Sequence, residues 1–84
     1  MTDLNTAFDQ AVVDSKRLNK RPDNATMLKI YALYKQASAG DNNDKKPVFS
    51  DMVARAKWEA WSRLRGTSQD DAMQRYIDLI EELR

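Results

Sequence analysis

The amino-acid sequence predicts an all-α domain, a four-helix bundle with a long crossover connection between the second and third helices. Apolar residues recur at three- and four-residue spacing along four segments. Pro22, Gly40, Pro47 and Gly66 separate these segments, and no hairpin signal or internal repeat interrupts them. The 84 residues are enough for one domain, 1–84, whose single core is only just large enough.

The first predicted helix runs from about Leu4 to about Asn19, with Asp3 in the N-cap position. Its apolar stripe begins at Leu4 and includes Phe8, beside the small residues Ala11 and Ser15. The small residues leave one flank of the stripe shallow. Either a neighbouring helix packs closely there, or the flank forms a groove.

The second helix begins near Asp23 or Asn24 and ends at Gly40, because glycine adopts positive φ easily just past a last helical turn. Tyr31, Tyr34 and Lys35 share one face of this helix. Tyrosines at this spacing usually pack in a core. A lysine beside them instead suits a ligand with a flat ring and a phosphate, so the residues leave both interpretations open.

Residues 39–50 form the longest irregular stretch, which is rich in turn-forming residues. The stretch is too long for a tight antiparallel connection. We therefore expect the second and third helices to run parallel, with the chain crossing over the bundle. Val48 and Phe49 are expected to anchor this crossover to the core.

The third helix begins near Ser50 or Asp51, and Gly66 ends it. Thr67 or Ser68 then caps the fourth helix, whose first turn carries two aspartates that complement the helix dipole.

Composition favours binding over catalysis. The chain has no Cys and no His, which leaves no thiol nucleophile, no imidazole base and no usual zinc or haem ligand. Neither glycine lies in a phosphate-binding loop, and no apolar run approaches the ~20 residues that span a bilayer. We expect a cytoplasmic protein with no catalytic residue, no cofactor, no metal and no stable membrane insertion.

The charges are unevenly placed, although the net charge is only +1. Six basic residues lie between Lys16 and Lys35 against one acid, Asp23. This basic band is either an anion-binding surface or an ordinary solvated flank. It supports an alternative function, a small helical protein- or nucleic-acid-interaction module, which would bind DNA in a salt-sensitive way.

Four blocks of the sequence, agreeing in order and spacing, resemble the acyl-CoA-binding protein family. The blocks are Tyr31-x-x-Tyr34-Lys35-Gln36-Ala37 with Gly40-Asp41, then Ala56-Lys57-Trp58-Glu59-Ala60-Trp61, Gly66-Thr67-Ser68, and Asp71-Ala72-Met73-x-x-Tyr76-Ile77. The resemblance extends from Phe8 to Leu83. It implies four helices with a long second connection, and a carrier that binds and releases long-chain fatty acyl-CoA esters without altering them.

The resemblance also implies binding residues. It assigns the CoA head group to Lys16, Tyr31, Lys35, Lys57 and Tyr76, with Lys35 and Lys57 on the ribose 3′-phosphate and its neighbours. It assigns the acyl groove or its rim to Phe8, Ala11, Val12, Leu28 and Tyr34. Trp58 could lie beside the adenine, whereas Trp61 is expected in the core. Val53 departs from the family, many of whose members have a lysine there.

The chemistry of CoA agrees with this assignment. Lysines give charge-assisted hydrogen bonds to a polyanion, and tyrosines give stacking and hydroxyl contacts. At about 0.8 kcal/mol per buried methylene, a sixteen-carbon chain offers on the order of 10 kcal/mol before the costs of association. We expect a monomer that binds long-chain acyl-CoA and no nucleic acid. A hydrolase or transferase would need a nucleophile and a base that the sequence does not supply.

Overall fold

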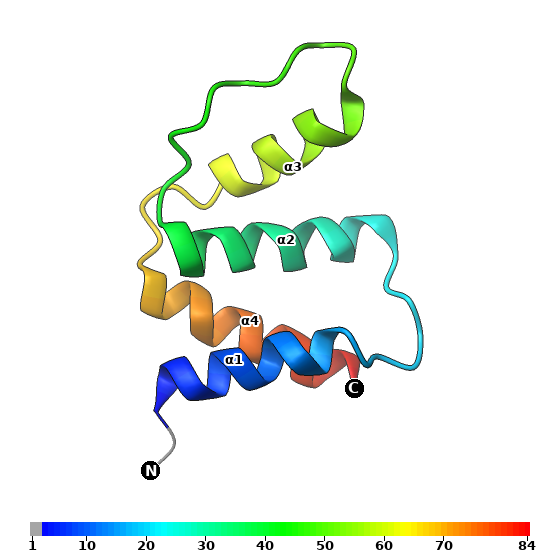
Figure 1. Cartoon of the computed structure of the whole chain (residues 1–84), viewed down its shortest axis with the longest axis vertical. Coiled ribbons are helices and arrows are strands. Elements are labelled where there is room, and N and C mark those ends of the chain that lie inside the picture. The colour runs from blue at the N-terminus through cyan, green and yellow to red at the C-terminus, as the bar shows by residue number, and fades with distance from the viewer. Residues whose placement is uncertain (1–2) are drawn as a thin grey trace.

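Four α-helices make up the fold in the computed structural model, which describes residues 3–84. The helices are α1 (Leu4–Ser15), α2 (Asn24–Ala39), α3 (Met52–Ser62) and α4 (Gln69–Leu83), and no strand occurs in this range. They lie side by side in the order α3, α2, α4, α1 (Figure 1). The principal extents of 44 × 29 × 14 Å describe a flattened bundle. The predicted all-α, four-helix class is confirmed.

The helix directions place α2 and α3 parallel to each other. In Figure 1, α1 and α4 run from left to right, whereas α2 and α3 run from right to left. The crossover, residues 40–51, therefore travels back along the length of α2 before α3 begins. The predicted parallel arrangement is confirmed.

The core lies where α4 packs between α1 and α2. Its buried residues are Phe8, Ala11, Leu33, Ala37, Ala72, Tyr76 and Ile80. The three alanines let the helix backbones approach closely, so a neighbouring helix fills the shallow flank of the α1 stripe. Helix α3 adds no residue to this cluster and contacts α2 alone among the helices.

Side chains cap three of the four helices. The carboxylates of Asp23 and Asp51 accept N–H groups from the first turns of α2 and α3, and the hydroxyl of Ser68 does so for α4. Asp3 occupies the N-cap position of α1, but its side chain accepts no capping hydrogen bond.

Helix α1 ends at Ser15, about one turn before the predicted end at Asn19. The N–H groups of Lys16 and Arg17 bond to carbonyls three residues earlier, which tightens the chain into a turn. The apolar periodicity continues through this turn without a helix, which explains the longer prediction.

A buried amide joins the ends of α2 and α3 to the start of α4. Gln36 is fully buried and donates to the carboxylate of Asp41 at 2.9 Å and to the carbonyl of Thr67 at 2.7 Å. The same carboxylate oxygen accepts the N–H of Gly66 at 2.9 Å. These two hydrogen bonds, with that from Gly66 the larger effect, hold the pKa of Asp41 below its usual range.

A second buried amide fixes the start of the crossover against α3. The amide of Asn42 donates to the carbonyl of Trp58 at 3.1 Å and to the hydroxyl of Ser62 at 2.9 Å, and accepts the N–H of Asp44. Arg65 donates to the carbonyl of Asn42 at 2.9 Å. Asn42 is therefore tied to three segments of chain.

The expectation that Val48 and Phe49 anchor the crossover to the core is wrong, because both side chains are exposed. The indole N–H groups of the two tryptophans donate instead to the carbonyls of Gly40 and Asp44, at 2.9 and 2.8 Å. Hydrogen bonds thus hold the first part of the crossover, and its second part projects from the helices.

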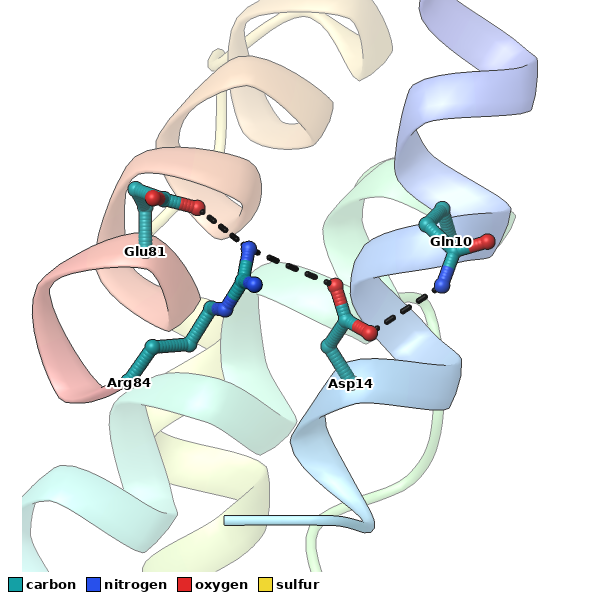
Figure 2. A network of polar contacts seen from close by, with 4 residues as sticks. All are labelled: Gln10, Asp14, Glu81 and Arg84. Atoms are coloured by element: carbon teal, nitrogen blue, oxygen red, sulfur yellow. Dashed lines mark hydrogen bonds and ion pairs between the residues drawn. The ribbon is translucent and has the colours of Figure 1, made fainter.

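Polar contacts also link α1 to the end of α4 (Figure 2). Arg84 donates to Glu81 at 3.0 Å and lies 4.0 Å from Asp14, which accepts from Gln10 at 3.0 Å. Exposed ion pairs of this kind contribute little to stability. The attachment of α1 therefore rests on its apolar face.

We expect Asn42→Ala to lower the free energy of unfolding by about 2–3 kcal/mol, because it leaves buried groups without partners. Urea unfolding followed by circular dichroism measures this. Asn43→Ala is the matched control, since Asn43 is the next residue along the chain and its side chain is exposed. Equal stabilities of the two variants would contradict the structural role given to Asn42.

Candidate ligand-binding site

A groove of about 650 Å³ lies between α2 and α3. Most of its lining is apolar, and two of the lining residues, Arg21 and Lys57, are cationic. The full lining is Arg21, Asn24, Met27, Leu28, Ile30, Tyr31, Met52, Val53, Ala56 and Lys57. A second groove of similar volume, lined by residues of α2, α3 and α4, shares Leu28 and Ala56 with it. We refer to the first as the α2–α3 groove.

Two lysine–aromatic pairs join α2 to α3. The Nζ of Lys57 lies 5.3 Å from the ring centroid of Tyr31, and the Nζ of Lys35 lies 4.8 Å from that of Trp61. Because the helices run parallel, Tyr31 and Lys35 on α2 meet Lys57 and Trp61 on α3 in the same order. Each lysine therefore lies over an aromatic ring of the other helix.

Neither Lys35 nor Lys57 forms an ion pair within residues 3–84. An ammonium group over an aromatic ring keeps its charge and can still donate hydrogen bonds to an anion. Two positive charges thus remain free where the groove meets the aromatic rings.

A separate aromatic cluster joins α2 to α1 and α4. The ring of Tyr34 lies 6.0 Å from that of Phe8 and 6.4 Å from that of Tyr76, and Phe8 meets Tyr76 edge-on at 5.1 Å. Phe8 and Tyr76 are buried, whereas Tyr34 is exposed. The face predicted for Tyr31, Tyr34 and Lys35 is therefore divided between two neighbours, α3 on one side and α1 with α4 on the other.

Burial raises the pKa of the Tyr76 hydroxyl, because desolvation disfavours the phenolate. The nearby hydroxyl of Ser15 lowers this pKa by a smaller amount. At neutral pH Tyr76 is therefore a neutral phenol that can both donate and accept a hydrogen bond.

Of the residues assigned to the acyl groove, only Leu28 lines the α2–α3 groove. Phe8 and Ala11 are buried in the core, and Val12 packs against that core. Tyr34 covers the core's edge from α2. The structure does not bring this set into one cavity, and ligand contact at these four residues stays a prediction.

Lys16, Trp58 and Trp61, which the resemblance also singled out, do not line the α2–α3 groove. Lys16 is exposed just past the end of α1, and its side chain forms no ion pair within the described chain. Trp61 is buried, as expected. Trp58 is half-buried, with the Nζ of Lys46 5.6 Å from its ring.

Sequence reasoning missed several groove residues. Met27, Ile30 and Arg21 from one side and Met52 from the other line the groove without having been assigned to it. The signal for Met27, Ile30 and Met52 was an apolar surface on two helices beyond what the core needed, whereas Arg21, in the connection before α2, gave no such signal. That signal identifies a groove only once α2 and α3 are known to be neighbours.

The described residues contain no cluster of three His, Cys, Asp or Glu side chains that could hold a metal ion. No helix in the described range has the length and apolar character needed to cross a membrane. An apolar groove between two helices, with free cations and aromatic rings beside it, is the site of a small all-α protein that binds an amphiphilic, anionic ligand.

Comparison with known proteins identifies the family. The family model described as "Acyl CoA binding protein" matches residues 5–80. The chain is 42% identical to acyl-CoA-binding protein homolog 1 of Caenorhabditis elegans, over 95% of this chain and 93% of that protein. It is 46% identical to the Drosophila melanogaster homolog over 90% and 88% of the two chains. The crystal structure of Oryza sativa acyl-CoA-binding protein 2 superposes with a TM-score of 0.93 at 32% identity, covering 96% of this chain and 90% of that one. The chain belongs to the acyl-CoA-binding protein family.

We expect Tyr76→Phe to remove the last component of the phenolate absorbance in an alkaline titration, the part that develops above the usual tyrosine pKa of about 10. The cause is the desolvation of the Tyr76 hydroxyl. Tyr31→Phe is the control for the loss of one tyrosine hydroxyl. A Tyr76→Phe variant that retains it would show that the hydroxyl is open to solvent.

Proposed function

We propose that this protein binds long-chain fatty acyl-CoA thioesters and acts as an intracellular carrier or pool former, without chemistry on the ligand. Family membership supports the ligand class. The observation that carries the proposal is the α2–α3 groove, an apolar channel next to two lysines that form no ion pair within residues 3–84.

The head group is proposed to bind at the lysine–aromatic pairs. Lys35 and Lys57 would donate charge-assisted hydrogen bonds to the ribose 3′-phosphate and its neighbours. Tyr31 lies under Lys57 and supplies a ring and a hydroxyl to the same region. Tyr76 and Lys16 are proposed as further head-group contacts, on the resemblance to the family alone.

The acyl chain is proposed to lie in the α2–α3 groove. Met27 and Leu28 on α2 face Met52 and Val53 on α3, and methionine adapts well to flexible apolar partners. Buried methylenes contribute about 0.8 kcal/mol each, so chain length should dominate affinity. The head group then supplies specificity.

We propose that the thioester passes through unchanged. No His or Cys is present, so neither an imidazole base nor a thiol nucleophile is available for acyl transfer. The family's description as a binding protein supports the same conclusion.

We further propose that residues 1–84 form one acyl-CoA-binding domain, acting as a cytoplasmic monomer. The family match over residues 5–80 supports the domain extent. One chain supplies all the proposed contacts, so a second subunit is not needed.

The basic band between Lys16 and Lys35 supports this function over a nucleic-acid-interaction module. Arg17 lines a groove beside the end of α1, whereas Arg21 and Lys29 line two adjoining grooves beside α2. A nucleic-acid surface needs its cations gathered on one face.

Lys35→Ala and Lys57→Ala should each weaken palmitoyl-CoA binding by about 1–3 kcal/mol, the scale of a lost charged hydrogen bond. Titration calorimetry measures the change. Lys29→Ala is the matched control, because Lys29 lies on α2 but lines the other groove. Equal losses in all three variants would point to overall charge rather than to a head-group site.

Affinity should rise with acyl length until the groove is full, and free CoA should bind far more weakly. Because ligand raises stability by RT ln(1 + [L]/Kd), thermal scans over a series of esters should show the same order. Equal shifts from free CoA and palmitoyl-CoA would remove the acyl groove from the proposal.

The same samples test the carrier function. Free thiol, assayed over hours against a control without protein, should stay at the control level. Protein-dependent thiol release would instead favour a hydrolase.

A further inference from the structure

Four large apolar side chains are strongly exposed where the crossover meets α3. Val48 is 70% exposed, Phe49 82%, Met52 78% and Val53 68%. Every other exposed large apolar side chain in the described chain is 42% exposed or less. We call Val48, Phe49, Met52 and Val53 the apolar tip.

Nothing in the fold requires the apolar tip. None of its residues belongs to the core or packs against it. The backbone there is fixed by polar groups, since Asp51 donates its N–H to the carbonyl of Val48 and caps α3 with its carboxylate. An exposed apolar group that does not stabilise the fold indicates an interaction surface.

The apolar tip projects from the molecule. Figure 1 shows the crossover at one extreme of the long axis, with α1 and the C-terminal end at the other. A protruding apolar surface can enter a lipid interface, which deforms around it. A protein partner would instead need a matching cavity.

The charges around the apolar tip suit an anionic interface. Lys45 and Lys46 precede it, with only Pro47 between, and the guanidinium of Arg55 lies 5.0 Å from the ring of Phe49. Arg55 also pairs with Glu59 at 3.6 Å. Two acids lie within the same stretch, Asp44 and the capping Asp51. Long cationic side chains beside apolar ones keep their charges among lipid head groups while the apolar groups enter the interface.

The apolar tip continues into the ligand groove. Met52 and Val53 line the α2–α3 groove together with Tyr31 and Lys57. A partner that binds the apolar tip therefore lies next to the α2–α3 groove.

We propose that the apolar tip docks the protein reversibly on membrane surfaces that contain anionic lipid. Val48 and Phe49 enter the interface, and Lys45 and Lys46 contact the head groups. Docking of this kind is peripheral. It places the α2–α3 groove beside the bilayer, so that an acyl chain can move between the two. This second step rests on the proposed carrier function, whereas docking does not.

Co-sedimentation with vesicles tests the docking. The vesicles are phosphatidylcholine alone or phosphatidylcholine with phosphatidylserine. We expect wild type to bind the second kind more strongly. Phe49→Asp should lower the partition coefficient by about tenfold, equivalent to about 1.4 kcal/mol, and Lys45→Glu with Lys46→Glu by at least about tenfold.

Val13→Asp is the matched control, because Val13 is 42% exposed on α1, at the other end of the molecule. It should bind vesicles like wild type. Circular dichroism checks folding, which Phe49→Asp should preserve because the ring is exposed. Absence of wild-type binding to either vesicle, or equal binding by Phe49→Asp and Val13→Asp, would overturn the proposal and leave the apolar tip to a protein partner.

A palmitoyl-CoA titration without vesicles separates this proposal from the carrier function. Phe49→Asp should bind palmitoyl-CoA like wild type. A wild type that binds palmitoyl-CoA but not vesicles would overturn docking alone. Docking without palmitoyl-CoA binding would overturn the carrier function and leave docking standing.

Discussion

The hydrogen bonds of Gln36, Asp41 and Asn42 set the position of α3, and the α2–α3 groove depends on that position. Helix α3 contacts neither α1 nor α4 and gives only Trp61 to the buried residues. Its place beside α2 is fixed where the ends of α2 and α3 meet the start of α4, through Gln36 to Asp41 and Thr67 and through Asn42 to α3. Buried amides with satisfied donors specify one geometry, because any shift would leave polar groups unpaired.

Because α3 is attached at one end, the two ends of the groove differ. The parallel helices place Lys35 and Trp61 nearest the hydrogen-bonded end, Tyr31 and Lys57 next, and the methionines towards the free end. Lys35 and Lys57 thus lie towards the end where hydrogen bonds hold α3, and the methionines line the other end of the groove, beside Arg21. That division suits an amphiphile with a head of fixed geometry and a tail of variable length.

The elements that the sequence predicted correctly depend on neighbours along the chain. The start of α2 near Asp23 or Asn24, its end at Gly40 and the cap of α4 at Thr67 or Ser68 are local effects. A crossover of this length also allows few topologies. The errors arose where a distant neighbour decides. Val48 and Phe49 are apolar, but hydrogen bonds from Trp58 and Trp61 already hold the crossover. The sequence alone also could not show that α4 lies between α1 and α2, where Phe8 and Ala11 are buried; their contact with an acyl chain stays a prediction.

Met52 and Val53 belong both to the groove and to the apolar tip, so occupancy of one surface affects the other. On the proposed arrangement, an acyl chain in the groove covers part of both side chains and leaves chiefly Val48 and Phe49 for the membrane. The loaded protein then gains less from docking than the empty one. Linkage requires the reverse as well, so that a docked protein holds its acyl chain less tightly by the same factor. Val53 strengthens this coupling, because its apolar side chain belongs to the surface that both ligands share.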